Sequence, residues 1–322
     1  MSITNIFSNN IIVITIGARI FGLLFWVLIC TYAIKIIPGR KAFFSILNIC
    51  TVSAVSGDTV TNAMCILFIA VLYKNLHDKN LIEKKDKIIL TISATMIALC
   101  KIVYLPFVFL VLLLDKEKFN NKKENIMTKS LVILTSCIVG IAWFLIGSFI
   151  LSNSNTNSIE QVKFILQNPI KYIFIIIQTY LNTGSSLIFQ STTGYELLCD
   201  SRVQVYTPIS YIYSVLLILG LFVKEDEKTI SLDKRKKCFV WVVIVGTIIL
   251  ITTAIYVQWT SMFEIGYSTV LGLQGRYFIP IYALLIFTID YFNIEMKKEK
   301  VFKINIVLQI IIIFLIMQAY MK

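Results

Sequence analysis

Arg276 is the residue of this sequence best suited to chemistry, because it stands in the segment Gln-Gly-Arg-Tyr-Phe-Ile-Pro at residues 274–280. The segment joins two apolar runs, 238–256 and 277–290, so a permanent positive charge is expected where a membrane helix begins. A guanidinium can donate hydrogen bonds to two phosphate oxygens at once, and the N–H groups of a helix N-terminus attract anions. Arg276 and Gln274 therefore suit a phosphate at the membrane surface. The alternative is an interfacial arginine beside Tyr277 in an aromatic belt.

Two further cations lie inside apolar runs. Arg19 lies about 12 Å along the run that begins at Ile11, at 1.5 Å per residue, so it is expected to face a bundle interior or a wet cavity. Lys101, near Tyr104, stands where an apolar run is broken, and its alternative is a simple interfacial lysine. With Arg276, these side chains predict an outward-facing cationic pocket that would suit an anionic lipid headgroup.

Asp58 is the acidic group nearest to this predicted pocket. It follows Ser56 and a glycine, and either Ser56 or Asp58 would cap a helix that starts at residue 59. The functional alternative is that Asp58, with Asn62 in the same motif, orients a basic partner or a substrate hydroxyl. Asp58 is also an available ion-pair partner for Arg19.

Several classes of site are excluded by composition. The one histidine lies in a Lys-rich loop, and the seven cysteines form no CxxC pair, so neither a histidine-built centre nor a zinc site nor disulfides are expected. P-loops, GxGxxG fingerprints and GxSxG elbows are missing, and no cofactor is expected. A general base would have to come from the few other acids expected on the outer side: Glu160, Glu196, Asp200 and Glu264.

The apolar runs that position these residues predict an all-α, polytopic transmembrane bundle. The chain of 322 residues is 57% hydrophobic with a mean hydropathy of +0.82, and it reads as a single membrane domain. About ten membrane-spanning or re-entrant helices are expected. Their ranges are 11–37, 42–55, 59–73, two within 88–114, 130–151, 208–223, 238–256, 277–290 and 304–320.

The charge pattern sets the expected orientation. Most of the 30 Lys and Arg residues lie in loops between the runs, which places these loops in the cytoplasm and both termini outside. The net charge of +12 therefore does not indicate nucleic-acid binding. Residues 88–114 read either as one span or as a hairpin broken near Lys101 and Pro106. The hairpin is preferred because it keeps both flanking Lys-rich loops inside. Outer loops are expected at 152–207, with an interfacial and then an embedded helix divided at Asn168-Pro169, and at 257–276.

Five segments together resemble a family of bacterial multi-pass membrane proteins, domain of unknown function 2142. They are Gly17-Ala18-Arg19 with Trp26, residues 53–62, Lys101-Ile102-Val103-Tyr104-Leu105-Pro106, Asn168-Pro169 and residues 274–280. Their order and spacing agree from about residue 11 to the end of the chain, and the last segment is the most specific.

That family is similar to the GT-C class of membrane glycosyltransferases, which use a sugar carried on a polyprenyl phosphate. The resemblance implies a bacterial plasma-membrane protein in which Arg276 and Lys101 hold the carrier phosphate and Arg19 lines the same cavity. GT-C proteins begin with an inner N-terminus, one span and an outer loop that bears the catalytic acid. This chain is expected to lack that part, as a fragment, a split gene or a mis-called start, so Asp58 is not assigned as the base.

The leading hypothesis is accordingly a GT-C-like glycosyltransferase, or a remnant of one, that transfers a sugar from a polyprenyl phosphate to a cell-envelope glycan acceptor. A flippase or transporter of lipid-linked saccharides is the second hypothesis, because broken helices also line transport sites. The third is a non-catalytic scaffold. The expected partners are membrane lipid, the lipid-linked sugar and the glycan acceptor. A partner subunit would supply the missing loop if the short form is the native one.

Overall fold

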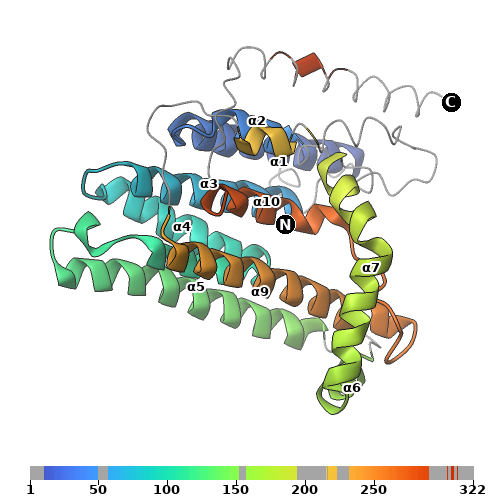
Figure 1. Ribbon diagram of the computed structural model, residues 1–322. Helices are drawn as coiled ribbons and strands as arrows, with labels where there is room; N and C mark the ends of the chain where they lie inside the picture. The colour runs from blue at the N-terminus through green and yellow to red at the C-terminus, as the bar shows by residue number, and fades with distance from the viewer. Residues whose placement is uncertain are drawn as a thin grey trace.

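The computed structural model describes residues 11–49, 57–151, 157–193, 215, 217–222 and 232–289, together with 303, 306–307 and 310 (Figure 1). Within these residues all regular structure is helical, which confirms the all-α prediction. The helices are α1 (Ile11–Ile36), α2 (Lys41–Ile49), α3 (Gly57–His77), α4 (Lys84–Cys100), η2 (Ile102–Leu113), η3 (Lys116–Lys118), α5 (Lys122–Leu151), α6 (Ser158–Gln167), α7 (Pro169–Thr193), α9 (Lys234–Gln258), η5 (Thr260–Met262), η6 (Gly275–Phe278), α10 (Ile279–Leu284) and η7 (Leu285–Phe287).

Four of the described helices are long and apolar enough to cross a membrane: Ile16–Ile36, Asp58–His77, Lys122–Gly147 and Lys234–Met262. The chain is therefore a helical membrane bundle. The total of about ten spans stays a prediction, because the runs 208–223 and 304–320 lie largely outside the described residues and α2 is described only to Ile49.

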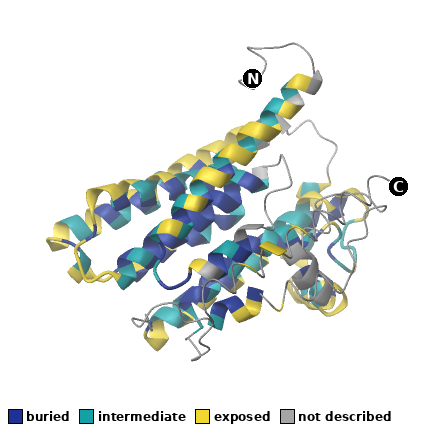
Figure 2. Ribbon diagram, turned by 90° about the horizontal axis from the view of Figure 1, so that it is seen from above, coloured by how far each residue is buried: buried dark blue, intermediate teal, exposed yellow. Residues whose placement is uncertain are grey.

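Helix α3 forms the centre of the bundle. Every residue from 61 to 73 is buried, which matches a helix that is apolar on all sides. Helices α1, α4 and α10 pack around it. Buried residues run through the middle of the bundle, whereas α1, beside the N label, carries many exposed apolar side chains (Figure 2). An apolar outer surface of this kind is what lipid would cover.

The segment 88–114 is a hairpin, as preferred from the charge pattern. Helix α4 ends at Cys100, Lys101 is extended with φ −152° and ψ 109°, and η2 runs back along α4. The Ile82 N–H donates to the Lys118 carbonyl at 2.9 Å, so the two ends of the hairpin meet. The break, predicted near Lys101 and Pro106, falls at Lys101, and the proline itself does not end a helix. Pro106 lies inside η2, whose tighter 3₁₀ winding continues past it to Leu113.

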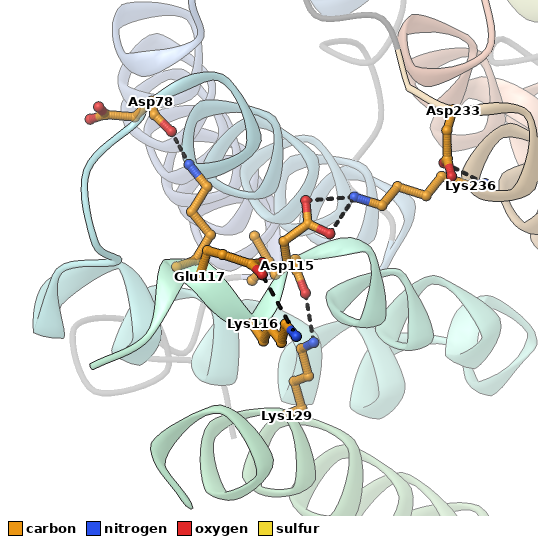
Figure 3. A network of polar contacts seen from close by, with 9 residues as sticks. Asp78, Asp115, Lys116, Glu117, Lys129, Asp233 and Lys236 are labelled. Carbon is orange, nitrogen blue, oxygen red and sulfur yellow. Dashed lines mark hydrogen bonds and ion pairs between the residues drawn. The ribbon is translucent and has the colours of Figure 1, made fainter. Parts of the chain in front are cut away.

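Ion pairs tie the Lys-rich ends of the helices together. Lys236 at the start of α9 contacts both carboxylate oxygens of Asp115, at 2.7 and 2.6 Å, and Lys129 of α5 donates to the Leu114 carbonyl at 2.6 Å (Figure 3). Asp86 accepts from Lys74 and Asn75, each at 2.9 Å. We call this the basic end of the bundle. These contacts gather the Lys-rich loops before α4, before α5 and before α9 at one end of the bundle.

Helices α6 and α7 run in a different direction from the bundle. They cross α9 steeply at the end opposite the basic end (Figure 1). The helical structure is interrupted between them at Asn168. The Asn168 N–H still donates to the Phe164 carbonyl, and Pro169 begins the next helix.

The basic end gives a test of how the bundle is held. Asp86 is only 2% exposed, so the Asp86→Ala variant removes the acceptor of the Lys74 ammonium and one of the two acceptors of Asn75 Nδ2. We expect a loss of about 1–3 kcal/mol in the free energy of unfolding in mixed micelles. Glu117→Ala is the control, because Glu117 is exposed and its pair with Lys116 at 4.0 Å is expected to contribute less than about 0.5 kcal/mol. Equal stability of both variants would contradict the prediction.

Candidate functional site

Three of the residues singled out in the sequence meet in one ion cluster. Asp58, in the first turn of α3, accepts a hydrogen bond from Lys101 Nζ, and its other carboxylate oxygen lies 3.3 Å from Arg276 Nε. The side chains are 13%, 27% and 20% exposed for Asp58, Lys101 and Arg276. They are thus partly shielded from water, where charge pairs interact more strongly than at an open surface. We call this the Asp58–Lys101–Arg276 cluster, and the end of the bundle that carries it the site end.

Aromatic side chains complete the cluster. Lys101 Nζ lies 4.4 Å and Arg276 Cζ 5.4 Å from the centre of the Tyr277 ring, so both cations make cation–π contacts with the same aromatic ring. The Tyr104 hydroxyl, which belongs to a fully buried side chain, donates to the Tyr277 carbonyl at 2.7 Å. This bond ties η2 to η6 and fixes the spacing between Lys101 and Arg276.

The extended backbone of Lys101 is what brings its side chain to the cluster. The Lys101 N–H ends α4 by donating to Ile97 at 3.0 Å, and the Lys101 carbonyl starts η2 by accepting from Tyr104 at 3.1 Å. Both backbone groups are satisfied even though the residue is not helical, which a bundle interior requires. Lys101 therefore occupies the turn between two antiparallel elements.

The loop before Arg276 is held by side chains of α7 and η5. The Val270 N–H donates to Thr179 Oγ1 at 2.9 Å, and the Leu271 N–H donates to Thr260 Oγ1 at 3.0 Å. Gly272 has a φ of +78°, and a Cβ there would lie 2.4 Å from Trp259. Only glycine fits this turn, which delivers the chain to η6 and Arg276.

A cavity of about 530 Å³ opens next to the cluster. Lys101, Tyr104 and Tyr277 belong to both. The remaining wall comes from η2, α5 and α9 and is mostly apolar: Ile102, Val103, Phe144, Leu250, Ile251, Thr253, Ala254, Ile255, Val257 and Gln258. The size lies within the range of pockets that hold small molecules. An apolar space with a cation at its edge suits a molecule with an anionic head and an apolar chain.

The structure brings together five of the residues singled out in the sequence, namely Asp58, Lys101, Tyr104, Arg276 and Tyr277. Gln274 lies two residues before Arg276, and its carbonyl accepts from the Tyr277 N–H at 3.2 Å. The Gln274 Oε1 atom is buried and has no hydrogen-bond partner among the described residues.

Other residues are placed differently. Arg19 was expected to face the bundle interior or a wet cavity, but it is exposed on α1 and does not line the cavity. Asp58, its available ion-pair partner, pairs with Lys101 and Arg276. Asn62 is buried on α3, and Ser56 lies outside the described residues. Helix α3 begins at Gly57, two residues before the predicted start, so Asp58 stands in its first turn, where a carboxylate interacts favourably with the helix dipole.

Sequence reasoning missed the walls that α5 and α9 contribute to the cavity. Phe144, Thr253 and Gln258 are separated from Lys101 by long stretches of chain, and nothing in one sequence pairs them. The only sign in the sequence that α9 lines a cavity was the polarity of Thr253 and Gln258 at the end of an apolar run. No group of three His, Cys, Asp or Glu side chains placed to hold a metal ion occurs in the described part of the chain.

The cluster predicts an energetic coupling between Asp58 and Lys101. Each of Asp58→Asn and Lys101→Met breaks the same ion pair, so the double variant should be less destabilised than the sum of the single variants. We expect a coupling of about 0.5–3 kcal/mol from a double-mutant cycle in mixed micelles. The matched cycle of Asp58→Asn with Arg19→Met should show no coupling, because Arg19 is exposed outside the cluster. Additive effects in the first cycle would contradict the geometry.

Comparison with known proteins places this arrangement in a family. No curated protein matches the chain, and no solved structure matches it. The profile of the family described as "Predicted membrane protein (DUF2142)" matches residues 1–285, a range that includes all three charged residues of the cluster. The resemblance seen in the sequence motifs is thereby confirmed, and the chain belongs to the DUF2142 family of predicted membrane proteins.

Proposed function

We propose that the Asp58–Lys101–Arg276 cluster binds the phosphate of a polyprenyl-phosphate-linked sugar, and that the protein acts as a GT-C-like glycosyltransferase in cell-envelope glycan synthesis. One observation carries the proposal: Lys101 and Arg276 share a single carboxylate, and Lys101 also lines an apolar cavity of about 530 Å³. The cavity would take the first part of the apolar chain, and the cations would contact the phosphate oxygens.

The charge balance of the cluster supports an anionic ligand. Asp58 neutralises one of the two cations, so the cluster keeps a net charge of +1 that a phosphate group would compensate. Arg276 can present two N–H groups to one phosphate, whereas Lys101 acts as a point charge. Because the leaving phosphate gains negative charge during transfer, cations already in place would stabilise the transition state without rearrangement.

The proposal leaves the general base outside the cluster. Both carboxylate oxygens of Asp58 already contact cations, one Lys101 and the other Arg276. Glu160 and Glu264 are exposed on α6 and in the loop before η6, and Glu196 and Asp200 lie outside the described residues. The acceptor hydroxyl would be activated by a carboxylate that approaches the cavity from the site end or from a partner subunit.

The orientation follows from the basic end. We propose that the basic end faces the cytoplasm of a bacterial cell and the site end faces outward, as positive-inside sorting favours. The lipid-linked sugar would then be used on the outer face of the plasma membrane.

A second candidate function is translocation of a lipid-linked saccharide. The observation that favours it is the extended residue Lys101 between α4 and η2, since a break inside a membrane hairpin can line a transport site. In this reading the cluster would bind the same phosphate, and no sugar would be transferred.

Binding of the carrier phosphate is the first test. We expect Arg276→Ala and Lys101→Ala each to weaken binding of undecaprenyl phosphate to the full chain in nanodiscs by about tenfold or more, the equivalent of one charge-assisted hydrogen bond. Native mass spectrometry would measure the bound fraction. Lys163→Ala is the control, because Lys163 is an exposed cation on α6 outside the cluster. Undiminished binding by both cluster variants would overturn the phosphate site.

Transfer and translocation are distinguished by the acceptor. Liposomes that contain the full chain and a labelled polyprenyl-phosphate sugar should release carrier phosphate only when a glycan acceptor is added, if the protein is a transferase. Movement of labelled lipid between leaflets without acceptor would instead establish the second candidate. If deletion removes a glycan and an Arg276→Ala copy restores it fully, the protein serves as a scaffold and both candidates fail.

A further inference from the structure

Helix α7 crosses α9 instead of running along it. Tyr172 and Tyr180 are eight residues apart on α7, about 12 Å at 1.5 Å per residue, yet their hydroxyls contact the adjacent residues Thr253 and Thr252, each at 2.7 Å. Two helices that ran side by side would pair residues that are equally far apart on both. The steep crossing is visible in Figure 1, where α7 runs across the direction of α9 near its end.

The crossing lies near the membrane surface if α9 spans the bilayer. Helix α9 is among the four helices able to span, and Thr253 is five residues, about 8 Å, from its end at Gln258. Interfacial helices bury their apolar face about 5–10 Å below the headgroups. The depth of the contact therefore matches a helix that lies in the plane of the interface.

The exposed surface of α6 and α7 is divided lengthwise into two stripes. One is apolar and recurs every three or four residues, as one side of a helix does. It consists of Ile159, Val162, Leu166, Ile170, Ile173, Phe174, Ile177 and Leu181, of which Leu166, Ile170 and Leu181 are 75%, 71% and 81% exposed. The other is polar and equally exposed: Glu160, Lys163, Gln167, Lys171, Gln178 and Asn182.

This division fits neither of the two ordinary environments. A helix in water would not leave a continuous apolar stripe uncovered, and a helix that crosses the bilayer would not carry a stripe of charged and amide side chains facing lipid. The third side of α7 is accounted for by the protein, because Tyr172, Ile175 and Thr179 are buried against the bundle and the loop before η6. An environment with acyl chains against the apolar stripe and water against the polar stripe suits both stripes.

We propose that α6 and α7 form an in-plane membrane anchor at the site end, with the apolar stripe inserted among the acyl chains of one leaflet and the polar stripe in the headgroup layer. The occupant of the apolar stripe is the bilayer of the same membrane that the bundle spans. The anchor reaches the site through Tyr180, whose ring meets Phe278 of η6 edge-on at 6.4 Å. The inference is independent of the ligand proposed for the cluster.

Photocrosslinking tests the anchor on the full chain in nanodiscs of phosphatidylethanolamine and phosphatidylglycerol. Benzoyl-phenylalanine would replace Ile177 or Leu181 on the apolar stripe, and in matched variants Gln178 or Asn182, one residue further along the same helix. All four side chains are exposed, so the replacements should leave the bundle folded. We expect several-fold more lipid adduct at Ile177 and Leu181 by intact mass spectrometry.

Three results would overturn the proposal. Equal lipid labelling at all four positions would show no preferred side, and adducts to another segment of this chain or to a second copy would show that protein covers the stripe. As a second measurement, Leu181→Lys should lower the thermal stability of the full chain in nanodiscs, whereas Asn182→Lys should not. An equal loss in both variants would also contradict an interfacial helix.

Discussion

Asp58 is the acceptor that allows Lys101 and Arg276 to lie side by side in a partly buried position. Two cations held this close without a shared carboxylate would repel each other, and more strongly than in water. The position of Asp58 is in turn fixed by α3, which is buried along most of its length. The cluster thus joins α3, at the centre of the bundle, to the turn of the 88–114 hairpin and to η6.

The charge and apolar patterns predicted more of the fold than of the site. The hairpin at 88–114 followed from where the lysines lie. Lys101 was singled out as a cation inside an apolar run, and Arg276 as a cation at the start of one. The partners of Asp58 did not follow, because the sequence pattern suggested only Arg19 as an available ion-pair partner. Arg19 lies on an exposed side of α1, and which side of a helix faces its neighbours is decided by packing when the helix is apolar all round. The cavity wall from α5 and α9 is a tertiary feature of the same kind.

Both cations of the cluster lie where regular α-helix is interrupted. Lys101 is extended between two helices, Arg276 lies in the short 3₁₀ turn that opens a helical segment, and Asn168 separates α6 from α7. Inside a membrane such breaks are tolerated only where the backbone groups still find partners. Here they do, through Ile97 for Lys101 and Phe164 for Asn168. These three breaks lie away from the basic end, where ion pairs join α3 to α4 and α9 to the segment between η2 and η3.

The Tyr–Thr contacts between α7 and α9 also bear on the order in which the protein is assembled during synthesis. Thr252 and Thr253 already donate their hydroxyl protons to Ile248 and Ile249, so Tyr180 and Tyr172 must be the donors in these contacts. The tyrosines leave the ribosome 72 and 81 residues before the threonines that accept from them. A segment resting at the membrane surface can bond to water during that interval, whereas one threaded through the lipid core would have to wait with its hydroxyls unsatisfied. The hydrogen bonds to α9, which is synthesised later, would then fix the position of α7. Helix α7 in turn contacts the loop before η6 and η6 itself, which carries Arg276.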